Sequence, residues 1–191
     1  EGERNESRQQ FAMQSGRRKV RVTVGDDAHG SASVVEQTYQ TFPWREEIVE
    51  EVQDPDAARL TTTTAYYENI DFPGSYGQIR HRIEPDGSWV RYSYDDLHRV
   101  LTETRPWLDA PADPVTAPEA ESRVLQYSYA PVDTMDIANT LDGQSPQSPG
   151  FNKPRVVAER VQGNLISLTF ASVRQANGAR EEIEEGGATP S

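Results

Sequence analysis

The chain has 191 residues, of which 35% are hydrophobic, and its 31 acidic and 19 basic side chains give a formal net charge of −12 at pH 7. This charge repels phosphates and anionic lipid heads, so we expect neither a nucleic-acid partner nor insertion into a membrane. Cysteine is absent, which excludes disulfides, thiolate zinc sites and cysteine nucleophiles.

The composition favours a β fold. Eight Tyr, five Phe and three Trp accompany frequent Val, Ile and Thr, which are the residues that pack best on a pleated surface. The modest hydrophobic fraction suits sheets that have one buried and one solvated face. We therefore expect an all-β chain of consecutive antiparallel β-hairpins that form a curved sheet.

The first elements follow a polar start. Residues 1–17 read as an N-terminal tail or as a continuation of neighbouring structure. Alternation of apolar and polar residues then predicts strands at 19–24 and 33–42, and the run 25–30, rich in Gly and Asp, predicts the turn that joins them.

Three two-strand units come next, and they share the same order of elements. Each has an alternating strand, a turn or loop rich in Pro, Asp or Gly, and a second strand that ends in aromatic residues. The units begin at Ile48, Ile79 and Val100, and a degenerate fourth unit covers 157–170. We expect one repetitive β-sheet region over residues 18–175, with its clearest part at 44–130.

The middle unit is the clearest hairpin. The turn residues are Pro85, Asp86, Gly87 and Ser88: Pro presets φ, Asp bonds nearby backbone, and Gly accepts a positive φ. Because side chains alternate across a strand, Ile79, His81 and Ile83 share one face of the outgoing strand. On the return strand, Val90, Tyr92 and Tyr94 lie on one face, and Trp89, Arg91 and Ser93 lie on the other.

Three stretches interrupt this pattern. The Pro-rich run 110–121 and the run 142–150 read as loops, since they are rich in strand and helix breakers. Residues 176–191 read as a flexible acidic C-terminal tail.

One motif resembles a known repeat. The sequence Tyr92-Ser93-Tyr94-Asp95, with Arg99 and an aliphatic residue after it, resembles the tyrosine-aspartate (YD, or Rhs) repeat. His98 stands where that motif commonly has Gly. Tyr127 and Tyr129 repeat the double tyrosine, but Ala130 replaces the Asp.

The resemblance implies a structural role. Proteins of this family, which include bacterial Rhs toxins, the cocoon of insecticidal toxin complexes and the teneurins, have long β-sheet strips that form a shell or a rigid extracellular body. It implies that paired tyrosines tie neighbouring hairpins together and that the turn Asp bonds backbone amides. The residues that would carry the repeat motif are Tyr92, Tyr94, Asp95, Arg99, Pro85, Asp86, Gly87, Tyr127 and Tyr129.

No motif for catalysis, a metal or a cofactor stands out. The three histidines, His29, His81 and His98, lack the spacing of metal ligands, and no nucleophile elbow or phosphate-binding glycine loop is present. Acidic clusters favour solvated surfaces over a hydrolase site, which is the least favoured alternative. Whether Asp26, Asp27, Asp54 and Asp56 hold calcium stays open, since the spacing of an EF-hand is absent.

The leading hypothesis is a non-catalytic wall segment of a large secreted or cell-surface protein, either around a toxin cargo or as an extracellular scaffold. Its partners would be flanking repeats or further copies of the chain, joined through sheet edges. The alternative is a glycan-binding or adhesin-like sheet that stacks sugar rings on exposed Trp89 or Trp107.

Overall fold

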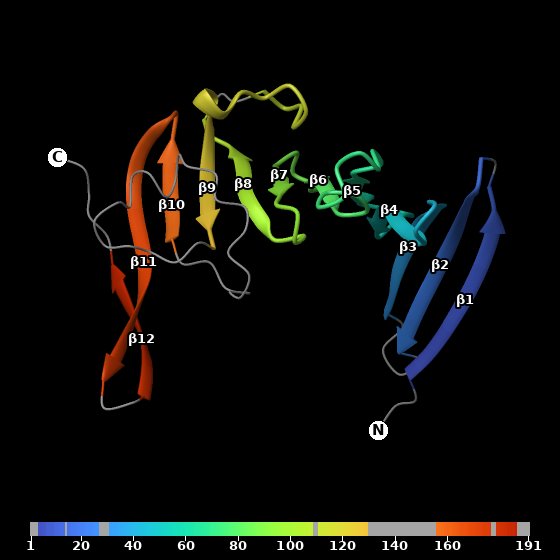
Figure 1. Ribbon diagram of the computed structural model, residues 1–191. Coiled ribbons are helices and arrows are strands. Elements are labelled where there is room, and N and C mark those ends of the chain that lie inside the picture. Colours follow the sequence, from blue (N-terminus) through green and yellow to red (C-terminus); the bar gives the residue numbers. More distant parts are fainter. Residues whose placement is uncertain are drawn as a thin grey trace. The chain divides into compact units, whose positions relative to one another are not determined.

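The computed structural model describes residues 4–13, 15–26, 31–108, 111–129, 156–176 and 179–186 (Figure 1). Over these residues the chain is all-β: twelve strands, each antiparallel to the next where registers are defined, follow one another in chain order in the sheet. The expected fold class of consecutive antiparallel strands is therefore confirmed. The chain divides into two units, one formed by 1–66 with 82–88 and the other by 67–81 with 89–191, and each is described by itself.

The first unit contains five strands in sequence. These are β1 (Arg4–Ala12), β2 (Arg17–Asp26), β3 (Ser31–Thr41), β4 (Glu46–Gln53) and β5 (Leu60–Tyr66). The pair β2–β3 confirms the predicted first hairpin, although residues 27–30 of its turn lie outside the described residues. Because β1 pairs along its whole length with β2, residues 4–12 continue the sheet, which was one of the two expectations for this segment.

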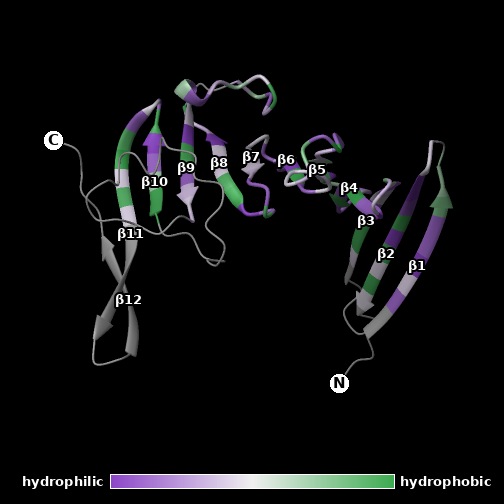
Figure 2. Cartoon of the chain, viewed as in Figure 1, coloured by the Kyte–Doolittle hydropathy of each residue, from purple (hydrophilic) through white to green (hydrophobic). Residues whose placement is uncertain are grey.

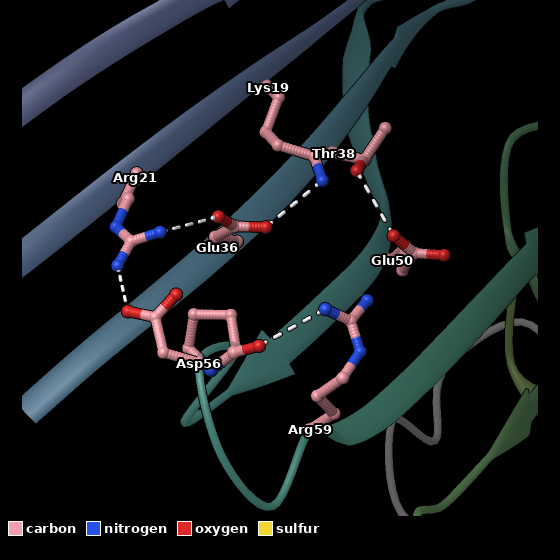
Figure 3. A network of polar contacts seen from close by, with 8 residues as sticks. Lys19, Arg21, Glu36, Thr38, Glu50, Asp56 and Arg59 are labelled. Carbon is pink, nitrogen blue, oxygen red and sulfur yellow. Dashed lines mark hydrogen bonds and ion pairs between the residues drawn. The ribbon is translucent and has the colours of Figure 1, made fainter.

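A network of charged side chains lies across β2, β3 and the turn that follows β4 (Figure 3). The Glu36 carboxylate accepts hydrogen bonds from Lys19 Nζ at 3.0 Å and from Arg21 Nη1 at 3.2 Å. Arg21 also pairs with Asp56, and Arg59 donates to the Pro55 carbonyl. Partly exposed pairs of this kind contribute about 1 kcal/mol or less each, so their main effect is to fix the turn against its neighbouring strands.

The strands that Figure 2 colours by hydropathy mix apolar and polar residues, so none of them is uniformly hydrophobic. The first unit nevertheless buries Val20, Phe42 and Val52 almost completely. Phe42 stacks on Trp44 with ring centroids 4.6 Å apart and meets the Tyr66 ring at 5.5 Å. Few buried apolar residues in strands of mixed polarity agree with the modest hydrophobic fraction of the sequence.

The predicted hairpin around residues 79–94 is present as β6 (Ile79–Ile83) and β7 (Trp89–Tyr94), which are neighbours in the strand order. Its turn closes through Gly87 N–H, which donates to the Glu84 carbonyl at 2.9 Å, and Gly87 has a φ of 82°. The Asp86 carboxylate accepts the Ser88 N–H at 2.9 Å. The Ser88 hydroxyl and N–H lower the pKa of Asp86, so this turn has the chemistry that its sequence predicts.

The second unit continues with β8 (Val100–Pro106), β9 (Ser122–Ser128), β10 (Val156–Val161), β11 (Asn164–Ala176) and β12 (Ala179–Gly186). The hairpin β10–β11 lies where the degenerate fourth unit was predicted. Its two-residue turn places Gln162 and Gly163 at φ of 50° and 80°, as hairpin turns require. Val156, Ala158 and Leu168 form a buried cluster on it.

The predicted C-terminal tail is wrong for residues 179–186. They form β12, which pairs antiparallel with β11, because backbone pairing with a neighbouring strand does not depend on the apolar alternation that this acidic segment lacks. The predicted loop 142–150 lies outside the described residues.

The predicted Pro-rich loop packs on one face of β7. Residues 111–121, which end in the short 3₁₀ helix η1 (Glu119–Glu121), offer carbonyls to two alternate side chains of that strand. Trp89 Nε1 donates to the Pro111 carbonyl at 3.1 Å, and Arg91 Nη1 donates to the carbonyls of Pro114 and Ala117 at 2.8 and 3.1 Å. The segment 111–121 is therefore a covering layer for this face of β7.

Replacing Trp89 by Ala is expected to lower the free energy of unfolding by about 3–5 kcal/mol, because the Trp89 side chain is only 2% exposed. Urea denaturation followed by circular dichroism measures this change. Trp107, which is 37% exposed, provides the control: Trp107→Ala should cost about 1 kcal/mol or less. Equal losses from the two substitutions would contradict the assignment of Trp89 to the covered face.

Candidate functional site

Three tyrosine hydroxyls make the same bond at equivalent places in the repeats. Tyr66 at the end of β5 donates to the Ile48 carbonyl at 3.1 Å, Tyr94 at the end of β7 donates to the Ile79 carbonyl at 2.9 Å, and Tyr129, just after β9, donates to the Val100 carbonyl at 3.0 Å. We call these bonds the tyrosine closures. Their acceptors are the three residues at which the sequence repeats begin, so each closure joins the end of a repeat to its start.

The closures are partly shielded from water. Burial is the leading cause that raises the pKa of each of the three tyrosines above the usual value of 10.0. A raised pKa keeps the hydroxyl protonated, which is the form that donates to a carbonyl. The closures are therefore neutral hydrogen bonds that hold two antiparallel strands in register at the end opposite their connection.

A second set of tyrosine contacts joins one repeat to the next inside the second unit. Tyr67, just after β5, donates its hydroxyl to the Tyr92 carbonyl at 2.7 Å. Its ring meets the Tyr94 ring edge-on, with centroids 6.2 Å apart and an interplanar angle of 88°. Tyr92 and Tyr94 in turn lie 6.4 Å apart. Such aromatic pairs add stability beyond their buried area, and Tyr67 is a contributor that the sequence motif did not single out.

The turn after Tyr94 is organised by one buried carboxylate. Asp95 Oδ1 accepts the N–H groups of Leu97 and Arg99, both at 2.9 Å, and Asp95 Oδ2 accepts Arg99 Nε at 2.7 Å. The Asp95 residue is 7% exposed. The Arg99 guanidinium lies 4.3 Å above the centre of the Tyr129 ring, so this turn is linked to the closure of the next repeat through a cation–π contact.

His98 occupies a left-handed position, with a φ of 62°, which glycine adopts without strain. Its Nδ1 lies 2.9 Å from the Gly74 carbonyl oxygen. Position 74 requires glycine, because a Cβ at this residue would lie 2.1 Å from the Asp95 carbonyl oxygen. The segment that precedes β6 is therefore held against the Asp95–Arg99 turn, a long-range contact that no local pattern in the sequence indicated.

The remaining motif residues have different places. Pro85, Asp86 and Gly87 form the turn described above. Tyr127 makes none of the closures; burial first, and then the nearby Glu103 carboxylate, raises its pKa. The prediction that Trp89 stacks sugar rings is wrong, because Trp89 is buried and its indole N–H is bonded to the covering loop. Trp107 is 37% exposed, so its proposed contact with glycans stays a prediction.

The described residues contain no group of three or more His, Asp or Glu side chains arranged to hold a metal ion. Asp54 accepts the Ala58 N–H, and Asp56 pairs with Arg21, whereas Asp27 and His29 lie outside the described residues. His81 Nδ1 is buried without a hydrogen-bond partner among the described residues, and burial lowers its pKa. No helix in the described part of the chain has the length and hydrophobicity needed to span a membrane.

Comparison of the chain with known protein families, with characterised proteins and with solved structures gave no match. The function must therefore be inferred from contacts within the chain. Those contacts join side chains to the backbone of neighbouring strands at repeated positions.

Tyr94→Phe is expected to lower the free energy of unfolding at pH 7 by about 1 kcal/mol, since the ring stays and one hydrogen bond is lost. Because the folded pKa of Tyr94 lies above the unfolded value of about 10, the contribution of the hydroxyl is complete below pH 10 and is lost as the pH rises further. Urea denaturation from pH 7 to pH 11 should show a smaller alkaline loss in the variant than in the wild type. Tyr127→Phe is the matched control at pH 7. An equal loss of unfolding free energy in this variant would show that the closure stabilises the fold no more than a tyrosine hydroxyl outside the closures.

Gly74→Ala is expected to cost at least about 2 kcal/mol, because the added methyl meets the Asp95 backbone and the two segments must move apart. Gly25→Ala is the matched control, since a Cβ there has nothing within 4 Å. Chemical denaturation of the two variants measures the difference. A cost for Gly74→Ala that is no larger than that of the control would disprove the close approach.

Proposed function

We propose that the chain is a non-catalytic repeat segment that forms part of a rigid β-sheet wall. The observation that carries this proposal is the recurrence of the tyrosine closure at the starts of three successive repeats. A bond that recurs at the same place in each repeat is typical of a contact that stabilises the repeat, whereas a binding or catalytic site would use residues that occur once. Two of the three closing tyrosines, Tyr94 and Tyr129, also belong to the motif that resembles the YD repeat, in which Tyr-x-Tyr-Asp motifs build structural shells.

The polar contacts of the motif support a structural role over a chemical one. Asp95, the buried carboxylate of the motif, is occupied by two backbone amides and by Arg99. A buried carboxylate with these partners fixes a turn. Its guanidinium partner is itself stacked on Tyr129, so both charges serve to join adjacent repeats.

The wider setting comes from the resemblance. In this proposal the wall belongs to a secreted or cell-surface protein, where it encloses a toxin cargo or serves as an extracellular scaffold. Strands at sheet edges present unpaired backbone groups that readily pair with another strand, so its partners are flanking repeats or further copies of the chain. The glycan-binding alternative has less support, because it retains only Trp107 of its two aromatic residues.

Duplication of one repeat tests the proposal. A second copy of residues 79–99, inserted between Arg99 and Val100, places a new first strand where β8 normally follows the Asp95–Arg99 turn. Because a repeat in a wall contacts only its neighbours, the longer chain should fold, and its urea m-value should rise with the added buried surface.

The control carries the same insertion with Tyr92, Tyr94 and Asp95 of the added copy changed to Ser. Hydrogen exchange should show protected amides in the intact added repeat and not in the control. An intact copy that stays unprotected, or that unfolds the rest of the chain, would refute the repeat-wall proposal.

A further inference from the structure

The segment between β5 and β6 exposes large apolar side chains that the fold does not use. Ile70 is 70% exposed and Phe72 is 64% exposed. Leu97, in the turn against which this segment is held, is 52% exposed. We call these three residues the apolar knob. Single exposed apolar residues are ordinary, but three on two segments joined by direct contacts form a feature that needs a cause.

The segment that carries Ile70 and Phe72 has a fixed conformation. The Asn69 side chain accepts the Asp71 N–H at 2.9 Å, and the Phe72 carbonyl accepts the N–H groups of both Ser75 and Tyr76 at 3.0 Å. At its base, Gly77 N–H donates to the Tyr67 carbonyl at 2.9 Å. The two apolar side chains are therefore presented on an ordered turn, which reduces the entropy cost of binding to them.

Two unusual residues hold this turn in place. Gly74 allows the backbone to approach Asp95 more closely than any side chain would permit. His98 accepts a left-handed φ, which glycine adopts without strain, and places its imidazole against the Gly74 carbonyl. A glycine at position 98 would satisfy the turn but would lack this tether. The chain thus tolerates backbone strain at the residue that positions the knob.

The exposed charged side chains beside the knob are carboxylates, whereas Arg99, in the same turn as Leu97, is paired with Asp95. Glu68, Asp71 and Asp96 are exposed beside the apolar residues, and residues 68–79 contain neither Lys nor Arg. Carboxylates at the rim of an apolar contact favour a partner with a basic rim and disfavour anionic membranes. Apolar centres with polar, charged rims are also the usual composition of protein interfaces.

We propose that the apolar knob docks into an apolar pocket on another protein, and that Lys or Arg side chains at the edge of this pocket meet Glu68, Asp71 and Asp96. The knob is a binding element separate from the wall function, because the closures and the repeat contacts do not use the side chains of Ile70, Phe72 or Leu97. The two proposals can therefore fail independently.

Selection from a phage-displayed library of random 12-residue peptides, with the whole chain as bait, tests this inference. Enriched peptides should combine an aromatic residue or Leu with Lys or Arg. Their affinity, measured as synthetic peptides by calorimetry, should fall about tenfold or more in the double variant Ile70→Ser/Phe72→Ser, as expected when central apolar contacts are removed. Leu108→Ser, which also removes a highly exposed apolar side chain, should leave the affinity unchanged.

His98→Gly distinguishes positioning from folding. This variant keeps every knob side chain, removes strain in the turn and loses only the tether to Gly74, so peptide affinity should fall while thermal stability is maintained or rises. Enrichment that is the same with the double variant as bait, or that selects acidic peptides, would overturn the proposal. So would light scattering that shows a self-associated chain dispersed by the double substitution, or knob-dependent binding to phosphatidylserine vesicles, because each identifies a different occupant.

Discussion

A tyrosine hydroxyl at the end of each of three repeats donates to the carbonyl of the residue that opens the same repeat, and the sheet depends on this bond. A strand pair with few buried apolar residues has little core to define its register, so side-chain contacts must supply the definition. The closures do this at Ile48, Ile79 and Val100. Because each hydroxyl is partly buried and neutral, its bond is not screened by salt as the surface ion pairs are.

The Asp95 turn and the segment 111–121 add further contacts that order the strands. Asp95 fixes the turn that connects two repeats, and Arg99 links this turn to the next repeat through its cation–π contact with Tyr129. On the covered face of β7, the segment 111–121 acts as a second layer over Trp89 and Arg91. A chain with few apolar residues thus gains order from polar contacts to backbone carbonyls, which allows its surface to remain strongly acidic.

The sequence predicted the parts that depend on short-range patterns. Alternating residues and the Pro85–Ser88 turn located β6 and β7, and the recurrence of the pattern located the starts of the repeats. Features that depend on distant contacts were not predictable. Alternation placed Trp89 on one face of its strand, but only the fold of 111–121 decided that this face is covered. No local pattern marks Gly74 as a point of close approach to Asp95, and the acidic segment 179–186 lacks the apolar alternation of a strand.

The hydroxyl protons of the three closures can be observed directly. In a mixture of light and heavy water, a tyrosine hydroxyl that exchanges slowly gives two carbon-13 signals for its ring carbon Cζ, one for each hydrogen isotope. The tyrosine closures predict split signals for Tyr66, Tyr94 and Tyr129 and a single averaged signal for Tyr127. A single averaged signal for all four tyrosines would show that water reaches the hydroxyls freely, and that the closures do not hold the repeats together.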